Sequence, residues 1–515
     1  MKNTKSELRT RTGAASISIC FTMSLFSLFL LMGSSENFPD VTIKNIIAKQ
    51  LNKKISELTP QDYRRIKTLQ IPGDVNDISL LTRLTNLTTL DISLAQIRDI
   101  QLFSQLKYLT TLTLSFDPAD HNLTKKHGVI NVDSMEAFDF NPISNLKSLR
   151  TLSLNGTGAD SIKPVAKLTN LRKLTISGLH LDNLEPAANL KNLDHLEIYN
   201  SSIGDIIAIG RLEKLEKLGL HRCHLSDITS MEKLTKLEYL TIDSSSISNI
   251  KPVAKMKNLK TLEISDQNIT DINPIGRLKY LQELNLTINQ VSDINSLANL
   301  KNLRILMISS APVNNIESIA HISNLRSLTL DKMPVSDIRP LANLRKIETL
   351  SFNNLTISDL SALANLKSIE NIYISDSSVD SLIPLEKLSN LISLTIIKSM
   401  VNDLSPLANL KKLDSLDIHE SKVSDIGVLS KLNNLKRLNL SSTQISDINP
   451  LANLKNLQAL NISYTKVNDI SPLKNLNSLK SLSVISTSVS NEQLLELQKN
   501  LPDLKITTKL PDTDY

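Results

Sequence analysis

A 22-residue repeat runs through most of this 515-residue chain. The unit from Leu438 to Leu460 reads LNLSSTQISDINPLANLKNLQAL, and the chain then restarts with LNISYTKVNDISPLKNLNSL. A period of this size is typical of a solenoid, in which each unit packs only against its neighbours. The chain therefore extends its core by adding coils rather than by enlarging one globular interior.

One apolar residue closes each unit in the same phase. There are 18 such closing residues, all 22 apart except for one step of 40 between Ile100 and Phe140. The long step predicts an insertion at about residues 117–134, after a strand at Leu112–Leu114. The closing residues are Ile78, Ile100, Phe140, Ile162, Leu184, Ile206, Ile228, Ile250, Ile272, Ile294, Ile316, Ile338, Leu360, Leu382, Leu404, Ile426, Ile448 and Ile470.

Two polar signals accompany the closing residue. Ten of the 18 prolines lie two residues after it, which suits a turn or short helical segment that needs no amide at that point. The residue before it is Asp in 13 units, Asn in three and Ser in two. Because these side chains accept hydrogen bonds from free turn amides, we expect a capped turn after every closing residue.

The two ends of the array depart from the repeat. Asp40 followed by VTIKNIIAKQL predicts a capped amphipathic helix, and Thr59-Pro60-Gln61-Asp62 predicts the start of a second helix. A further helix is predicted at Glu492–Lys499, with a closing edge at Leu504–Ile506. We therefore divide the chain into a helical N-terminal cap at 36–66, repeats at 67–490, and a C-terminal cap and tail at 491–515.

The first 35 residues have the layout of an export signal. Residues 2–11 are basic, Ala14–Met32 is a run of 19 residues without a charge, and Gly33, Ser34 and Ser35 are small. This order is that of a secretory signal peptide, and the apolar run is also almost long enough to span a bilayer. We expect residues 1–35 to be a signal cut near Ser34 or Ser35, or else an uncleaved membrane anchor. Either alternative makes the protein exported, secreted or held at the cell surface.

Composition narrows the possible chemistry. The net charge is +6, of which +3 lies in the first eleven residues, so the rest gives no electrostatic case for nucleic acid. Aromatic residues are 3% and Trp is absent, which requires an aliphatic core. The only cysteines are Cys20, in the apolar run, and Cys223, so a cysteine zinc cluster is excluded.

The repeat pattern LxxLxLxxNxIxDIxPLxxLxxL resembles the leucine-rich repeat, in the 22-residue form of the bacterial internalins, over about residues 66–490. The resemblance implies an α/β solenoid. This would be a leucine-rich repeat horseshoe with a parallel β-sheet on its concave face, short 3-10 or turn segments on its convex face, and helical N- and C-terminal caps. It also implies an exported adhesion or virulence protein that binds a protein ligand, such as a host surface protein.

The chain departs from the family at one position. The asparagine that the family places five residues before the closing residue is kept only at Asn289. Other polar residues hold it elsewhere and can still bond to neighbouring backbone, whereas Ala95, Leu179, Ala311, Met333 and Leu355 cannot, so we expect looser turns there. The polar replacements are Thr157, Ser201, Cys223, Ser245, Ser377, Ser399, Ser421, Thr443 and Thr465.

Side chains that alternate with the buried Leu and Ile of each strand should point to the concave face. They lie 11, 9, 7 and 6 residues before the closing residue, and most are Ser, Thr or Asn. One zone is richer in Tyr and charged residues, which are favoured at interfaces, so we predict a ligand-binding zone there. It comprises His195, Glu197, Tyr199, Lys217, His221, Arg222, Tyr239, Asp243 and Glu263. A sparser secondary zone comprises Tyr373, Asp376, Lys398, Asp417, His419 and Glu420. Both sets could also be ordinary solvated positions.

Other constellations have structural explanations. His195 and His221 face the same way on neighbouring strands, but no convincing third ligand is present, so we expect no metal and no cofactor. Turn capping accounts for the column of Asp residues, and Cys223 occupies the position otherwise taken by Ser, Thr or Asn.

We therefore expect a non-catalytic protein-interaction module. The sequence contains no nucleophile elbow, phosphate loop or metal motif that would support an enzyme. The alternative is an intracellular leucine-rich repeat scaffold or regulatory subunit of another enzyme, which requires another purpose for residues 1–35.

Overall fold

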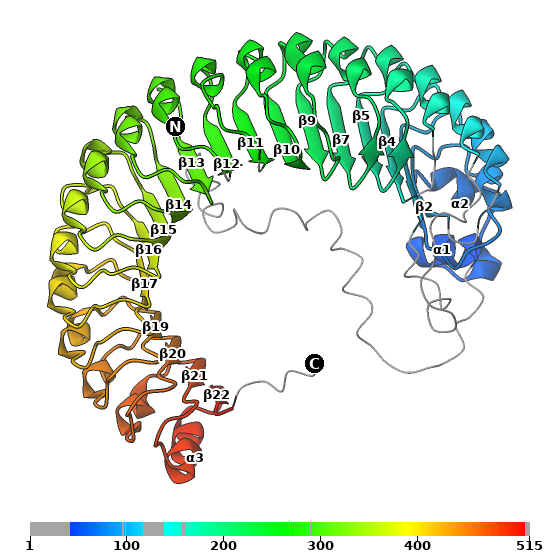
Figure 1. The fold of residues 1–515 in the computed structure, drawn as a ribbon. Coiled ribbons are helices and arrows are strands. Elements are labelled where there is room, and N and C mark those ends of the chain that lie inside the picture. The colour runs from blue at the N-terminus through cyan, green and yellow to red at the C-terminus, as the bar shows by residue number, and fades with distance from the viewer. Residues whose placement is uncertain are drawn as a thin grey trace, which may run out of the picture.

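The computed structural model describes residues 42–94, 97, 99–116, 139–156, 161–266, 268–288 and 290–509. Stacked coils form an open horseshoe with the strands along its inner rim and short 3-10 helices along its outer rim (Figure 1). The expected leucine-rich repeat solenoid is therefore confirmed. The predicted insertion at 117–134 and the predicted signal or anchor at 1–35 lie outside the described residues.

One parallel sheet of 20 strands lines the concave face. Each strand pairs with the strand of the next coil, so Leu284 lies beside Leu306 and Leu306 beside Leu328. The strands are β1 (Thr68–Ile71), β2 (Thr89–Ser93), β3 (Thr111–Ser115), β4 (Thr151–Asn155), β5 (Lys173–Ser177), β7 (His195–Tyr199), β9 (Lys217–His221), β10 (Tyr239–Ser245), β11 (Thr261–Asp266), β12 (Glu283–Ile288), β13 (Ile305–Ser309), β14 (Ser327–Met333), β15 (Thr349–Leu355), β16 (Asn371–Ser375), β17 (Ser393–Ile397), β18 (Ser415–Asp417), β19 (Arg437–Asn439), β20 (Ala459–Asn461), β21 (Ser481–Ser483) and β22 (Lys505–Thr507). A separate pair joins β6 (His180–Leu181) to β8 (Ser202–Ile203).

Helices cover the two ends and the convex face. The α-helices are α1 (Ile43–Gln50), α2 (Pro60–Arg65) and α3 (Asn491–Asn500). The 3-10 helices are Ile55–Glu57, Ser79–Arg83, Gln101–Gln105, Asn141–Asn145, Lys163–Lys167, Glu185–Asn189, Ile207–Arg211, Thr229–Lys233, Lys251–Lys255, Ile275–Arg277, Asn295–Asn299, Glu317–His321, Arg339–Asn343, Ser361–Leu363, Ile383–Leu385, Ser405–Asn409, Gly427–Lys431, Asn449–Leu451 and Ser471–Asn475.

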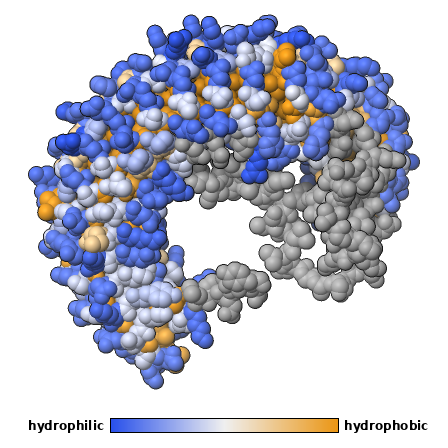
Figure 2. Space-filling view, in the orientation of Figure 1, coloured by the Kyte–Doolittle hydropathy of each residue, from blue (hydrophilic) through white to orange (hydrophobic). Residues whose placement is uncertain are grey.

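A continuous aliphatic core fills the coils. All 18 predicted closing residues are buried, and Leu or Ile side chains from the strands and convex turns pack against them. Phe103 and Phe352 are the largest side chains that are fully buried. In the space-filling view hydrophilic residues dominate the outer rim, and hydrophobic residues appear between it and the inner edge (Figure 2).

The predicted capping of the convex turns is confirmed in every unit. The side chain before the closing residue accepts a hydrogen bond from the amide two residues later in all 18 units, at 2.6–3.4 Å. Proline then occupies the first turn of many of these 3-10 helices, where no amide partner is needed. The polar residue before each closing residue therefore marks the start of each outer turn.

The turns that lack a polar residue five positions before the closing residue differ from expectation. Leu179, Ala311, Met333 and Leu355 are buried and pack in the core. At two of these positions the strand continues through the apolar residue, and Met333 pairs with Leu355 in register. The prediction of looser turns is therefore wrong for Met333 and Leu355, because apolar burial and strand pairing replace the missing side-chain hydrogen bond.

A second ladder on the edge of the sheet was not predicted. In nine coils an Asn amide donates a hydrogen bond to a backbone carbonyl of the preceding coil, at 2.7–3.1 Å. Lysines at the same position of other coils instead donate to these asparagines, as Lys214 does to Asn192 at 2.8 Å and Lys412 to Asn390 at 2.7 Å. This edge ladder bonds neighbouring coils in addition to the sheet.

The end helices lie close to where they were predicted. Helix α1 begins at Ile43 and is capped by Thr42, whose hydroxyl accepts a hydrogen bond from the amide of Asn45; the expected cap, Asp40, lies outside the described residues. Helix α2 has the predicted capping box of Thr59 and Asp62. Lys53 also pairs with the buried Asp62 at 2.8 Å, which ties the two helices of this end together.

The capping aspartates predict acid sensitivity. Hydrogen bonds from the amide and hydroxyl of the serine two residues later lower the pKa of Asp359, Asp403 and Asp469. Their contribution to stability is therefore present above the ordinary carboxyl pKa and is lost as the pH falls through the lower folded-state pKa. We expect the triple Asp→Asn variant, which keeps the accepting oxygen, to lose less thermal stability between about pH 5 and pH 2 than the wild type.

Circular dichroism melts at each pH measure this difference. The matched control replaces Asp182, Asp380 and Asp503, which cap no 3-10 turn, with Asn. An equal reduction of acid sensitivity in the control would contradict the role given to the caps.

Candidate binding site on the concave face

The N-terminal half of the concave face carries a mixed aromatic and charged cluster. Glu197 and Tyr199 on β7, His221 on β9 and Asp243 on β10 lie on consecutive paired strands. We call these four residues the concave cluster. Strand pairing puts position 199 beside 221 and 221 beside 243, so the row is set by the 22-residue register.

His221 is the hub of the concave cluster. Its Nδ1 lies 2.6 Å from Oδ2 of Asp243, and its Nε2 lies 3.4 Å from Oε2 of Glu197. The ring of Tyr199 stacks on the imidazole with centroids 4.5 Å apart and planes 5° apart. The Tyr199 hydroxyl donates to Glu197 at 3.4 Å, so the aromatic pair and the two carboxylates form one connected network.

Gly219 makes room for this network. A Cβ at this position would lie 1.9 Å from Oε2 of Glu197 and 2.8 Å from Nε2 of His221. The glycine lies on β9 between the two side chains, where most coils place Ser, Thr or a larger residue. Its missing side chain allows the Glu197 carboxylate to lie across the strand and reach the imidazole.

The network shifts the ionisation of its members. Burial alone would lower the pKa of His221, but its hydrogen bonds to Asp243 and Glu197 outweigh this and raise the pKa to about 9. Burial, together with the nearby Glu197 charge, raises the pKa of Tyr199 to about 12. Burial acts to raise the pKa of Asp243, but the hydrogen bond from His221 prevails and lowers it. At neutral pH the cluster therefore holds an imidazolium between two carboxylates.

The remaining residues of the predicted zone fall into three arrangements. Lys217 places its Nζ 4.6 Å from the centroid of the half-exposed Tyr239 ring, next to the concave cluster. Glu263 lies on the neighbouring β11, where burial raises the pKa of its carboxyl. Arg222 is not on the strand surface: it follows β9 in a left-handed turn with φ of 53°, and its amide donates to Asp243 at 3.0 Å.

His195 points toward the sheet edge instead of the cluster centre. Its Nδ1 lies 2.5 Å from Oδ1 of the buried Asp194, whose other oxygen accepts from Nε of Arg172 at 2.7 Å. Asp194 was not assigned to the site from the sequence, because this residue precedes the strand and belongs to no concave row. Its place in the edge row, next to a concave histidine, was the available signal.

The secondary zone is divided. Asp417 and His419 are joined at 2.7 Å, and Asn439 of the next strand donates to Asp417 at 3.2 Å. Lys398 pairs with Asp376 at 3.3 Å, and both adopt left-handed turns beyond their strands. Tyr373 is 40% exposed, with no ring contact among the described residues. Glu420 also lies in a left-handed turn, 4.0 Å from His419.

A further polar row between these zones was missed. Ser309 donates to Asp331 at 2.7 Å, Asn353 donates to Asp331 at 2.5 Å, and Ser375 donates to Asn353. The four residues occupy the same position of β13, β14, β15 and β16. Their small polar side chains gave no sequence signal for a linked row.

The described residues hold no cluster of His, Cys, Asp and Glu suited to a metal ion. Cys223 is buried, and its thiol donates to the carbonyls of Ile198 and His221, which fits the structural role predicted for it. Burial raises the pKa of this thiol to about 11. Among the described residues no helix is long and apolar enough to cross a membrane.

Coils of this length with a parallel concave sheet define the leucine-rich repeat class. A sequence profile described as "Leucine-rich repeat region" matches residues 130–273 and 218–449, and one described as "Leucine Rich repeats (2 copies)" matches 433–475. The first profile covers more than half of the chain, which therefore belongs to the leucine-rich repeat family. The leucine-rich repeat assignment made from the sequence pattern is therefore confirmed.

Solved structures agree with this assignment. The internalin InlF of Listeria monocytogenes is 25% identical over 74% of this chain and 93% of its own, with a TM-score of 0.41. The protein LIC12759 of Leptospira interrogans is 20% identical over 72% of this chain and 98% of its own, with a TM-score of 0.59. Drosophila Toll, solved with Spatzle, is 16% identical over 70% of this chain and 57% of its own, with a TM-score of 0.58. The latter two support the fold and nothing further. No curated protein matches the sequence.

The imidazolium of the concave cluster gives a direct test. We expect His221, seen by NMR in protein with labelled histidines, to titrate near pH 9 in the wild type and nearer its ordinary value of 6.5 in Asp243→Asn. Because the folded-state pKa is raised, the stability it contributes is present below pH 6.5 and is lost as the pH rises through 9.

The resonance is assigned with His221→Gln. Gly219→Ala should also lower the midpoint, because the added Cβ displaces Glu197. A wild-type midpoint near 6.5 would show that the two carboxylates do not hold the proton.

Proposed function

We propose that this chain is an exported, non-catalytic module that binds a protein ligand on its concave face, centred on the concave cluster and the adjoining Lys217, Tyr239 and Glu263. The observation that carries the proposal is a cluster of aromatic and charged side chains on neighbouring strands of a preformed sheet whose other positions are mostly small and polar. Aromatic anchors surrounded by ordered charges are typical of interface centres.

Binding would depend on rigid complementarity. The strands are held by backbone pairing on both sides, and His221 is fixed by three partners, so little side-chain freedom remains to be lost on binding. Tyr239 of this site and the neighbouring Arg222 are among the exposed side chains that a ligand would reach. Tyr199 instead supports them from within the network.

Resemblance to internalins supports export and a host surface protein as ligand, which would make this an adhesion or virulence protein. An intracellular scaffold or regulatory subunit is the alternative function. The signal-like layout of residues 1–35 favours export over that alternative.

The binding proposal is tested with Tyr239→Ala combined with Arg222→Ala. We expect at least a tenfold loss of affinity, because exposed Tyr and Arg anchors commonly contribute more than about 1 kcal/mol each. Ligands are first found on an array of animal cell-surface ectodomains, and affinities are then measured by interferometry.

The matched control replaces two exposed convex residues, Ile207→Ala with Ile383→Ala. Both variants should melt within a few degrees of the wild type. Equal affinity of the concave variant and the wild type would place the ligand elsewhere on the molecule.

Export is tested independently by N-terminal sequencing of the protein from fractionated cells and medium. We expect a mature chain that begins near Ser34 or Ser35, or a full-length chain in the membrane fraction. Unprocessed protein in the cytosol would reject export and favour the scaffold.

A further inference from the structure

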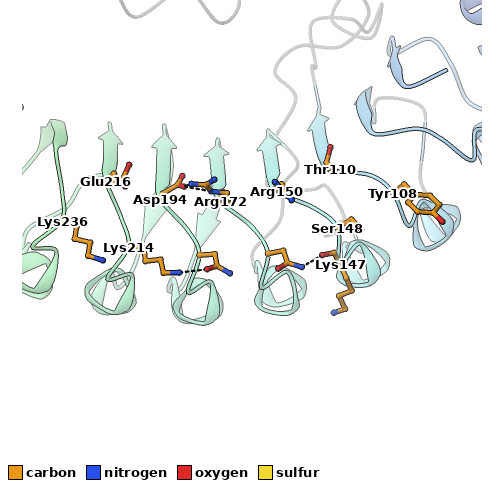
Figure 3. A pocket seen from close by; sticks show the side chains of 12 residues that line it. Tyr108, Thr110, Lys147, Ser148, Arg150, Arg172, Asp194, Lys214, Glu216 and Lys236 are labelled. Atoms are coloured by element: carbon orange, nitrogen blue, oxygen red, sulfur yellow. Dashed lines mark hydrogen bonds and ion pairs between the residues drawn. The ribbon is translucent and has the colours of Figure 1, made fainter. Parts of the chain in front are cut away.

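A groove runs along the edge of the sheet where the strands begin, outside the concave face. It has a volume of about 900 Å³ and extends from Tyr108 to Lys236 across consecutive coils. Residues at the starts of the strands line one side, and residues of the coil turns line the other (Figure 3). We call it the lateral groove.

The lateral groove is basic at both ends. Five of its lining side chains are basic and two are acidic, a net formal charge of +3. In the middle Arg172 and Asp194 are paired at 2.5 Å and neutralise each other. Positive charge thus remains near Lys147 and Arg150 at one end and at Lys236 at the other, while Glu216 lies beside Lys214.

Side chains, and not the backbone, must recognise an occupant. The amides of Arg172, Asp194 and Glu216 each donate to the carbonyl of the preceding coil, so this edge offers no free strand for β-addition. Within the described part of the chain, the guanidinium of Arg150 and the amine of Lys236 make no hydrogen bond or ion pair. They are therefore available to a ligand without disturbing the fold.

An aromatic anchor lies at one end. Tyr108 is 68% exposed and borders the groove beside Lys147 and Arg150. Tyr and Arg together form the favoured centres of protein interfaces.

We propose that the lateral groove binds an extended acidic segment of a protein partner, with carboxylates at both ends of the segment and neutral or basic side chains at its middle. Arg150 and Lys236 are four coils apart, about 19 Å at the spacing of neighbouring strands. About six residues of extended chain span this distance.

The charge pattern favours peptide over nucleic acid. Glu216 lies between Arg172 and Lys236 along the starts of the strands, and a continuous row of phosphates would meet its repulsion. A peptide can place a lysine or a neutral side chain at that point and keep its carboxylates for the ends. This site is distinct from the concave cluster, so it does not depend on the function proposed above.

The test uses the full-length protein and a fluorescein-labelled peptide, Glu-Glu-Gly-Ser-Lys-Ser-Gly-Glu-Glu, in fluorescence anisotropy at low ionic strength. We expect saturable binding that weakens about tenfold in Arg150→Ala with Lys236→Ala, since two charge contacts together contribute about 1.4 kcal/mol. The matched control, Lys163→Ala with Lys251→Ala on the convex face, and the concave variant Tyr239→Ala should bind as the wild type does.

A charge swap sharpens the test. Arg150→Glu with Lys236→Glu should prefer the reversed peptide, Lys-Lys-Gly-Ser-Glu-Ser-Gly-Lys-Lys, over the original. Absence of saturable binding, equal loss in the convex control, loss in the concave variant, or tighter groove-dependent binding of a thymidine decanucleotide would each overturn the proposal.

Discussion

Apolar contact between adjacent coils is the interaction on which the structure depends. No coil can bury its own Leu and Ile residues, because each is only one strand and one turn thick, and the partner surface is always the next coil. Burying an aliphatic side chain contributes about 1.5–3 kcal/mol, and every closing residue is buried. The ends lack such a partner on one side, which explains why α1 and α2 cover the first coil and α3 packs at the last (Figure 1).

Polar ladders solve the problem that stacking creates. A coil that turns twice in 22 residues leaves amides and carbonyls that the sheet cannot pair, and unpaired buried groups cost free energy. The capping Asp, Asn and Ser residues take the amides of the convex turn, and the edge ladder takes carbonyls beside the strands. Conformational cost is accepted at one further point, because 13 of the described residues, spaced in the repeat from Gly156 to Ser486, hold a left-handed conformation at or just beyond the end of a strand. Gly and Asn tolerate this conformation well, whereas Arg222, Lys332 and Lys398 adopt it at a conformational cost.

The sequence predicted the architecture well because a repeat states the same rule many times. The period fixed which residues share a row, so Ile206 and Ile228 were assigned to the core and Asp205 and Asp227 to the caps from spacing alone. Row membership does not fix rotamers. Spacing could not reveal that His195 turns to Asp194 while His221 turns to Asp243, because that choice depends on neighbouring strands and on Gly219. Spacing also failed to predict the turns at Met333 and Leu355, because packing there compensates for a missing polar side chain.

One departure from the repeat lies next to the concave cluster. The left-handed turn is held on both sides of one stretch, at Arg222 and again at Ser310, but β10, β11 and β12 continue as extended strand through residues 244, 266 and 288. The same stretch adjoins the stacked Tyr199 and His221 and contains Tyr239, Asp243 and Glu263. Because β14 and β15 are as long as β10, strand length alone does not mark this stretch, whereas the stacked aromatic pair and the charges beside it do. Stability alone does not require a half-buried charge network next to an exposed aromatic ring, and this combination is the ground for the binding proposal.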